Sequence, residues 1–410
     1  IQIQTNTHNL DNIPLTLYNP YKSCIPKDIS DVIREVEAKS ILRKHKRIDS
    51  WFISCYGMNL YRGCAHNCVY CDGRAETYQV NGEFGTDVTV KSNAIGILKR
   101  ELDPKRKRKP MKRCYIMMGG GVNDSYQPIE HKYELTRQAL QLVYEFGFPA
   151  SILTKSTLVL RDIDIIKKIN KQNRAIVSFS LSSTDDEISA IFEPGVPPPS
   201  KRLEAIKTLT AEGITCGMFL MPTIPYITDT AEVMEQTISQ ACNAGIKFII
   251  FSGMTLKEGR QKDYFSNVLR QHYPDLAEEY RKIYMGNQWG GPTQQYHDSI
   301  NKTFFDIAKR YKIPVRIPSY LYTDLLDEND LVAVMLDQID YMLKLRGQKS
   351  PHGYASYVIS KIDQPLSDLR TELSSIRGIG KSTEMVILEI IKTGRSSYYE
   401  KLLNWQNPKL

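Results

Sequence analysis

The sequence predicts an α/β fold, a partial (β/α)6 barrel followed by a small all-α domain. Short apolar runs rich in β-forming residues alternate with helical stretches up to about residue 251, which gives six such units. Strands that alternate with helices of this length are typical of parallel crossovers. After about residue 325 the strand patterns stop and only helical patterns remain.

The elements of the barrel, residues 51–325, follow from these runs in chain order. Strands are expected at residues 52–61, 113–118, 149–154, 175–182, 215–221 and 247–251, with a further strand at 315–318. Helices are expected at residues 93–102, 132–146, 160–170, 199–213 and 229–245. A polar leader, residues 1–50, precedes them and includes a predicted helix at 28–46. We expect this leader to wrap around the barrel or dock on it.

The region after the barrel divides into three parts. Residues 326–347 predict a connecting helix that ends at Gly347, which marks the domain boundary. Residues 349–353 are expected to be a linker, and residues 365–404 predict two or three short helices. Residues 348–410 therefore form the predicted C-terminal domain.

The composition is that of a globular protein, because 41% of the 410 residues are apolar and 24% are charged. The longest apolar runs are far too short to cross a bilayer, and no signal peptide is visible. Eight cysteines are too few for a disulfide scaffold, so a cytoplasmic protein without a membrane partner is expected. The net charge of +8 permits an acidic partner such as nucleic acid, but ordinary enzymes also carry such a surplus.

Three cysteines, Cys64, Cys68 and Cys71, form the pattern C-x3-C-x2-C just after the first predicted strand. A structural zinc site needs four ligands. His66 could serve as the fourth only by folding back on the same tight loop, and the sequence has no second CxxC pair. A [4Fe–4S] cluster on three thiolates instead leaves one iron open, as catalytic metal sites do. The spacing therefore favours an iron–sulfur cluster over zinc.

This motif, with Tyr70 just before the third cysteine and "DGR" after it, resembles the signature of radical SAM enzymes. The resemblance implies that S-adenosylmethionine (SAM) binds the open iron and is cleaved to a 5′-deoxyadenosyl radical, which takes a hydrogen atom from a substrate. Over roughly residues 50–320 the chain resembles the broad spore photoproduct lyase-like branch, often labelled DNA repair photolyase. The segments that carry this likeness include "YRGCAHNCVYCDGR", "GVNDSYQPIE", "ILTKSTLVLRDIDII" and "MPTIPYITD".

The resemblance also implies which residues bind SAM. The glycine turn Gly119, Gly120 and Gly121 follows the second strand, where the family's backbone binds the SAM amino group. Lys155 ends the third strand, where relatives contact the SAM carboxylate, and Ser180 on the fourth strand fits a contact to the ribose or carboxylate. Tyr70 and four further polar residues are additional candidates. They are Ser178, on the same face as Ser180, and Glu193, Asp124 and Gln127 near strand or loop ends. Turn formation and helix capping are the alternative roles for Glu193, Asp124 and Gln127.

A radical enzyme that reuses SAM needs a side chain that returns a hydrogen atom to the product. Tyr126 and Tyr226 lie in predicted loops after strands and are the candidates for this role. Cys114 and Cys216 each begin a strand and are expected at the other end of the barrel or in its core, as small buried apolar residues.

The C-terminal domain resembles a helix-hairpin-helix module. Gly378, Ile379 and Gly380 form an apolar turn between two predicted short helices, and Lys381 begins the second. Such modules hold a backbone phosphate without reading bases. A P-loop is excluded because Ser375 stands where its first glycine is required. A structural αα-hairpin that packs on the barrel is the alternative. Basic runs at residues 43–47 and 105–109 could extend a phosphate track, although each alone fits a solvated loop.

These features predict a radical SAM enzyme that repairs or modifies a base in nucleic acid, with DNA favoured and with a flavodoxin or ferredoxin as electron donor. One alternative keeps the radical chemistry but moves it to RNA, a peptide or a small molecule. Another is a non-catalytic nucleic-acid-binding protein stabilised by a metal.

Overall fold

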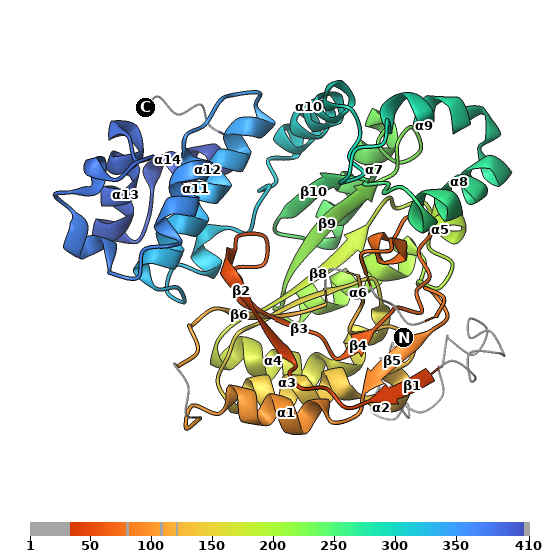
Figure 1. Cartoon of the computed structure of the whole chain (residues 1–410), viewed down its shortest axis with the longest axis horizontal. Helices are drawn as coiled ribbons and strands as arrows, with labels where there is room; N and C mark the ends of the chain where they lie inside the picture. Colours follow the sequence, from red (N-terminus) through yellow and green to blue (C-terminus); the bar gives the residue numbers. More distant parts are fainter. Residues whose placement is uncertain (1–32, 79–81, 107–109, 120–121, 406–410) are drawn as a thin grey trace, which may run out of the picture.

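The computed structural model describes residues 33–78, 82–106, 110–119 and 122–405 (Figure 1). Its centre is a seven-stranded sheet in the order β10–β9–β8–β7–β6–β3–β2. Strands β3, β6, β7, β8, β9 and β10 run parallel in this sheet, and β2 pairs antiparallel with β3 at one edge. The six parallel strands confirm the predicted partial (β/α)6 barrel. The strands are β2 (Leu42–Asp49), β3 (Ser54–Met58), β6 (Tyr115–Met118), β7 (Ala150–Thr154), β8 (Ala175–Leu181), β9 (Thr215–Thr223) and β10 (Ile249–Gly253).

Helices connect these strands and cover the outside of the sheet (Figure 1). The apolar stripe of α4, made of Ile165, Ile166 and Ile169, is buried, and the central strand β8 is buried along its whole length. Pro199 begins α6, where its missing N–H costs nothing. These helices are α1 (Ala94–Leu102), α2 (Glu130–Tyr133), α3 (Leu135–Glu145), α4 (Ile163–Gln172), α5 (Asp186–Phe192), α6 (Pro199–Ala211) and α7 (Ala231–Ala244). After β10 come α8 (Arg260–His272), α9 (Ala277–Ile283) and α10 (Gln294–Tyr311).

The helix predicted at residues 28–46 is wrong in its described part. Residues Ile33–Val36 form β1, which pairs with β5 (Val88–Lys91) in a small sheet with β4 (Tyr61–Arg62), and β2 follows from Leu42. Residues rich in Lys, Arg and Glu favour a helix locally. The ladder between β2 and β3 adds hydrogen bonds that the isolated segment lacks, so tertiary pairing decides the structure.

The C-terminal helices cover the end of the barrel where the strands begin (Figure 1). Tyr115, the first residue of β6, donates from its hydroxyl to the carbonyl of Leu321 at 2.7 Å. Just before β6, Lys112 bonds Asp330 at 2.6 Å. The cysteine motif follows the strand that ends at Met58, so the two features lie at opposite ends of the barrel. The C-terminal elements are α11 (Glu328–Leu345), α12 (His352–Ile359), α13 (Lys381–Thr393) and α14 (Ser397–Leu403).

Three further expectations differ from the structure. Residues 315–318 form no strand, because Pro314 precedes them and Pro318 ends them, and neither proline can donate to a ladder. The predicted linker already contains the start of α12 at His352. The segment before the Gly378 turn holds short 3₁₀ helices, Leu366–Leu369 and Leu373–Ser375, in place of an α-helix. The helix-hairpin-helix module itself and the domain boundary near Gly347 stay predictions.

The buried apolar side chains of the strands and the C-terminal helices form one continuous core, which includes Phe179 on β8 and Ile387 on α13. A second cluster packs the cysteine loop against α8 and α9. In the part of the chain that the structure describes, every helix is too short or too polar to span a bilayer.

Candidate functional site

The three motif cysteines line one cavity at the carboxyl ends of the parallel strands. Cys64 and Cys68 are buried and Cys71 is half-buried. The cavity, of about 110 Å³, is also lined by Asp124, by Lys155 after β7 and by Ser180 on β8. The carboxyl ends of parallel strands are where working residues of such folds gather. The structure therefore brings the cysteines, Lys155 and Ser180 together, as the sequence predicts.

Gln127 and Asp124, from the loop after β6, hold the first half of the cysteine loop. The side chain of Gln127 accepts a hydrogen bond from the backbone N–H of Ala65 at 2.9 Å and donates to the carbonyl of Gly63 at 3.1 Å. Asp124 lies 3.2 Å from His66 of the same loop. Gln127 and Asp124 thus position the loop around Cys64. This is a larger role than the local turn formation that the sequence also allowed for them.

His66 has no ring nitrogen left for a metal. Its Nδ1 faces the carbonyl of Gly195 at 2.9 Å, and its Nε2 faces Asp124. Asp124 also accepts from the Thr154 hydroxyl at 2.8 Å and from the backbone N–H of Lys155 at 2.7 Å. Burial alone would raise the pKa of Asp124, but these hydrogen bonds and His66 lower it. The histidine therefore acts as a bridge between the cysteine loop and its neighbours.

Arg74, in the "DGR" that follows the motif, satisfies the backbone of the cysteine loop. Its guanidinium donates to the carbonyls of Cys68 at 3.1 Å, Asn67 at 3.2 Å and Phe84 at 3.3 Å. It also stacks 3.6 Å from the ring centroid of Tyr264 on α8. A tight loop leaves carbonyls without strand partners, and a planar guanidinium can serve several of them at once.

The second half of the loop is tied to the segment after β10. Asp72 accepts from the Thr255 hydroxyl at 2.7 Å, from Lys257 at 2.6 Å and from Gln261 at 3.0 Å. Gln261 is buried and also donates to the carbonyl of Tyr70 at 2.9 Å. Segments 183 to 191 residues apart in the chain thus fix one loop.

Glu193 is the centre of a buried ion-pair network beside the cavity. Its carboxylate accepts from Lys155 at 2.8 Å and pairs with Arg202 on α6, and Tyr70 donates its hydroxyl to the same group. Lys155 also donates to Ser180 at 2.9 Å. Burial alone would raise the pKa of Glu193, but Arg202 and Lys155 hold it well below its usual range. Glu193 is therefore ionised, and it fixes the Lys155 ammonium at the cavity wall.

Two glycines allow close backbone approaches at the site. A Cβ on Gly119 would lie 2.1 Å from the carbonyl oxygen of Leu153, and the residue has a φ of +78°, so glycine is required. Gly120 and Gly121 lie outside the described residues. A Cβ on Gly195 would lie 2.6 Å from the carbonyl oxygen of Ala65 and 2.8 Å from that of His66. The loop after α5 thus packs directly on the cysteine loop.

Replacing Gly195 by alanine is expected to lower the free energy of unfolding by about 1–3 kcal/mol, because the new methyl group meets backbone that cannot move freely. Gly96→Ala is the matched control. Gly96 is exposed in the first turn of α1, where a Cβ meets nothing within 4 Å, so alanine should raise stability by up to about 1 kcal/mol. Urea unfolding of the two variants checks this. Equal stabilities would contradict the close packing of the two loops.

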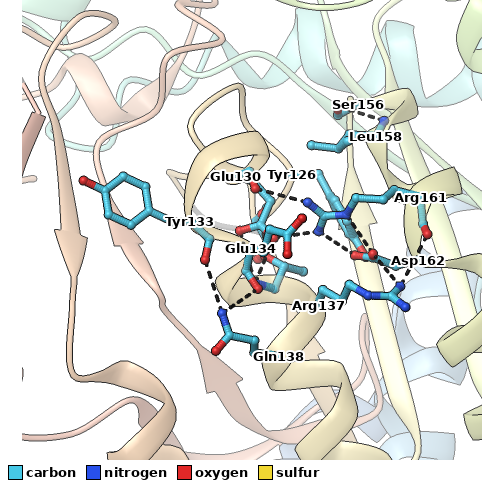
Figure 2. Close-up of polar contacts among 12 residues, drawn as sticks. Tyr126, Glu130, Tyr133, Glu134, Arg137, Gln138, Ser156, Leu158, Arg161 and Asp162 are labelled. Carbon is cyan, nitrogen blue, oxygen red and sulfur yellow. Dashed lines mark hydrogen bonds and ion pairs between the residues drawn. The ribbon is translucent and has the colours of Figure 1, made fainter. Parts of the chain in front are cut away.

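The two tyrosines predicted as hydrogen donors lie away from the cavity lining. Tyr126 is fully buried, and burial raises its pKa. It borders the network of Glu130, Arg161 and Asp162 in Figure 2, in which Arg161 bonds each carboxylate at 2.8 Å. Tyr226, in the loop after β9, packs among aromatic rings that include Tyr296, with 5.6 Å between the two ring centroids. Their role as hydrogen donors stays a prediction. Ser178 is buried on β8 and does not line the cavity either.

The donor set fits an iron–sulfur cluster. The three cysteines line one cavity, and His66 adds no fourth ligand because both of its ring nitrogens face protein oxygen atoms. Three thiolates suit a [4Fe–4S] cluster, whereas a structural zinc site needs four ligands. Burial raises the pKa of all three thiols, that of Cys68 to about 12, so they are protonated until a metal replaces the protons.

Comparison with known proteins agrees with this geometry. Residues 58–238 match the radical SAM superfamily. An uncharacterized protein of Mycobacterium tuberculosis is 30% identical over 262 residues, which cover 63% of this chain and 75% of that protein. An uncharacterized protein of Methanocaldococcus jannaschii is 33% identical over 224 residues, 54% of this chain and 78% of that protein. This chain belongs to the radical SAM superfamily.

A solved structure of spore photoproduct lyase, complexed with a dinucleoside spore photoproduct, shares the fold of this radical SAM chain. The TM-score is 0.50 at 17% identity, and the match covers 68% of this chain and 79% of that one. The radical SAM superfamily uses a [4Fe–4S] cluster and SAM. Cys64, Cys68 and Cys71 are the residues that would hold the cluster.

Sequence reasoning missed several residues that shape the site. Arg202 has no sequence signal, because its partner Glu193 becomes visible only once α5 and α6 are packed. Arg74 had a signal, since it stands three positions after the last cysteine. Thr255, Lys257 and Gln261, the residues after β10 that bind Asp72, had no signal in the sequence.

Proposed function

We propose that this radical SAM chain acts on a nucleic acid, repairing or modifying a base, in the cytoplasm and with a flavodoxin or ferredoxin as electron donor. The observation that carries the radical chemistry is the convergence of the three cysteines, Lys155 and Ser180 on one cavity. When bound, the cluster and SAM supply a 5′-deoxyadenosyl radical that takes a hydrogen atom from a substrate carbon. In the described residues all cysteines are free thiols, which suits a reducing compartment.

The residues of the chain hold and orient SAM. The ammonium of Lys155 has a single defined position, because Glu193 and Ser180 both bond it. From there it can attract the carboxylate of SAM as a point charge. Arg202 compensates the second oxygen of Glu193, so part of the Lys155 charge remains for a ligand. The ring centroid of Tyr70 lies 5.4 Å from the lysine nitrogen, so the ring adds a cation–π contact that helps to hold the ammonium in place.

The choice of nucleic acid as substrate rests on charge. The net charge is +8, and exposed lysines and arginines gather on β2, which forms an edge of the main sheet in the described chain. Phosphate contacts supply most of the sequence-independent affinity for nucleic acids. The related solved structure holds a dinucleoside lesion, and this agrees with a substrate of that class.

Anaerobic reconstitution with iron and sulfide, followed by dithionite and SAM, tests the proposal through the amount of 5′-deoxyadenosine formed. We expect 5′-deoxyadenosine, and more of it when lesion-containing DNA is added. If RNA or a peptide raises the yield and DNA does not, the substrate assignment is wrong. If no 5′-deoxyadenosine forms under any of these conditions, the proposed chemistry is wrong.

Lys155→Met is expected to weaken SAM binding about tenfold or more while leaving the iron content unchanged, because the ammonium binds the ligand and not the metal. Isothermal titration with SAM and iron analysis separate the two effects. Lys167→Met removes an exposed lysine on α4 and serves as the control. Equal SAM affinities of the two variants would contradict this role of Lys155.

A further inference from the structure

A basic and aromatic surface lies at the opposite end of the barrel from the cysteine cavity. A groove of about 600 Å³ runs between β2 and the helices α11 and α12. It is lined by residues 43–51 on one side and by residues such as Ala333, Ser356 and Ser360 on the other. Four basic residues of β2, Arg43, Lys44, Lys46 and Arg47, are exposed. These four cations border the groove, and the carboxylates among its lining residues are two, Asp49 and Asp337.

The two carboxylates are already engaged by the protein. Asp337 accepts a hydrogen bond from the Ser50 hydroxyl at 2.5 Å, and Asp49 accepts one from the backbone N–H of Trp51 at 2.8 Å. The four exposed cations of β2 form no ion pair among the described residues at the distances that define one. The groove therefore presents a net positive field to solvent.

Two exposed tyrosines extend this surface along α12. Tyr354 is 53% exposed and Tyr357 is 44% exposed, and their ring centroids lie 6.4 Å apart. The ammonium of Lys361 lies 4.1 Å from the centroid of the Tyr357 ring. The two rings lie side by side and form a small exposed aromatic patch, and bases stack on such rings beside cations.

The glycine turn before α13 joins the same surface. A Cβ on Gly378 would lie 2.4 Å from the ring of Tyr354, so the turn packs against this tyrosine. On Gly380 a Cβ would meet nothing within 4 Å, which leaves that side of the turn open. Lys381, directly after it, is exposed at the start of α13. The turn, the tyrosines and the basic strand thus form one continuous face.

We propose that this face, defined by Lys46, Arg47, Tyr354, Tyr357 and Lys361, seats a single-stranded segment of nucleic acid, with bases on the tyrosines and phosphates on the cations. This proposal rests on the proposed function and adds where the nucleic acid binds and that it binds as a single strand. Charged residues also protect sheet edges from aggregation, and this alone would account for the cations of β2. It does not account for exposed aromatic rings beside them. Single strands are favoured because unpaired bases expose faces for stacking.

The direction of β2 links this face to the reaction site. Asp49 pairs with Ser54 at the start of β3, whereas Leu42 pairs with Met58 at its end, directly before the cysteine loop. The exposed cations of β2 therefore form a track along the side of the barrel, from the C-terminal helices toward the cysteine end. A strand bound on the tyrosines can follow this track and reach the cavity with its free end.

Fluorescence anisotropy with a labelled oligothymidylate of about 20 nucleotides tests the location across a series of salt concentrations. The double variant K46A/R47A is expected to make the slope of log affinity against log salt shallower by about 1.4, since each lost phosphate contact removes about 0.7. The double variant Y354A/Y357A should weaken binding about tenfold or more at unchanged slope, because stacking releases no counterions. Loss of Tyr354 could also disturb the Gly378 turn that packs against it. The single variant Tyr357→Ser leaves Tyr354 in place and should still weaken binding.

The controls are K168A/K171A, two exposed lysines on α4, and Y311A, an exposed tyrosine that ends α10. Both should bind like the unmodified chain. If the test variants bind as their controls do, the location is wrong, although a nucleic-acid substrate remains supported. If the unmodified chain binds no single strand, duplex or RNA at low salt, the proposed function falls as well. Preference for duplex over single strands would overturn the strand type.

Discussion

Replacing Cys68 by alanine is expected to abolish cluster binding and to lower 5′-deoxyadenosine formation more than about 100-fold. The reason is the number of ligands. The three thiolates would hold the cluster, and among the described residues of the cysteine loop His66 cannot replace one of them, because both of its ring nitrogens face protein oxygen atoms. The backbone of Cys68 is held by Arg74, so the loop should keep its shape without the thiol. Iron and sulfide analysis after anaerobic reconstitution measures the effect.

Cys242→Ala is the matched control for this experiment. Cys242 is a free, half-buried thiol on α7, away from the cavity, and its loss should leave iron content and activity unchanged. Cys64→Ala and Cys71→Ala should behave as Cys68→Ala does. A variant of any of the three that still holds four irons and cleaves SAM would contradict the ligand assignment. Zinc without iron in the unmodified chain would do the same.

The barrel could be predicted from the sequence because its signals are local. Strand β8 is an apolar run that only two serines interrupt. The apolar stripes of the helices, such as Ile165, Ile166 and Ile169 on α4, repeat with the helical period. The cysteine spacing is also local. Because parallel strands place their carboxyl ends at one edge, the strand positions of Lys155 and Ser180 already brought these residues to the cysteines.

The remaining features depend on contacts between distant segments. Residues 33–49 favour a helix by composition, and the edge of β3, which fixes β2 as a strand, cannot be seen within that segment. The partners of Asp72 stand more than 180 residues further along. The charge state of Glu193 depends on Arg202 and Lys155 at once. Such networks follow from packing, and local patterns do not encode them.

The position of the C-terminal helices has a functional consequence. Asp330 of α11 bonds Lys112 just before β6, and Asp324, in the segment that leads into α11, bonds Arg174 just before β8, whereas the cysteine loop lies where strands end. On the proposal that the face beside the C-terminal helices seats the substrate, that substrate has to extend along the barrel to reach the cavity, which a long, flexible chain can do.

Glu193→Gln is expected to lower the free energy of unfolding of the apo-protein by about 3–5 kcal/mol. The glutamine has almost the same shape, but it presents a neutral amide to Lys155 and Arg202. Arg202 is fully buried, so its charge would lose its compensation in a medium of low dielectric constant. Removal of one partner from a buried ion pair is costly for this reason, even where the pair as a whole contributes little. Urea unfolding of the apo-protein measures the effect without a contribution from the cluster.

Glu212→Gln is the control, because it removes a carboxylate that is 44% exposed and pairs with Lys167 on the surface, where less than about 1 kcal/mol is expected. The pH dependence adds a second check. Since the folded-state pKa of Glu193 is lowered, its contribution is complete above the unfolded-state pKa of about 4.3 and is lost as the pH falls below that value toward the folded-state pKa. The stability difference between the unmodified chain and Glu193→Gln should therefore be largest near pH 7 and should shrink below about pH 4. If the two glutamine variants are equally stable at pH 7, Glu193 is not the charged partner of Arg202 and Lys155, and Lys155 is not held at the cavity wall in this way.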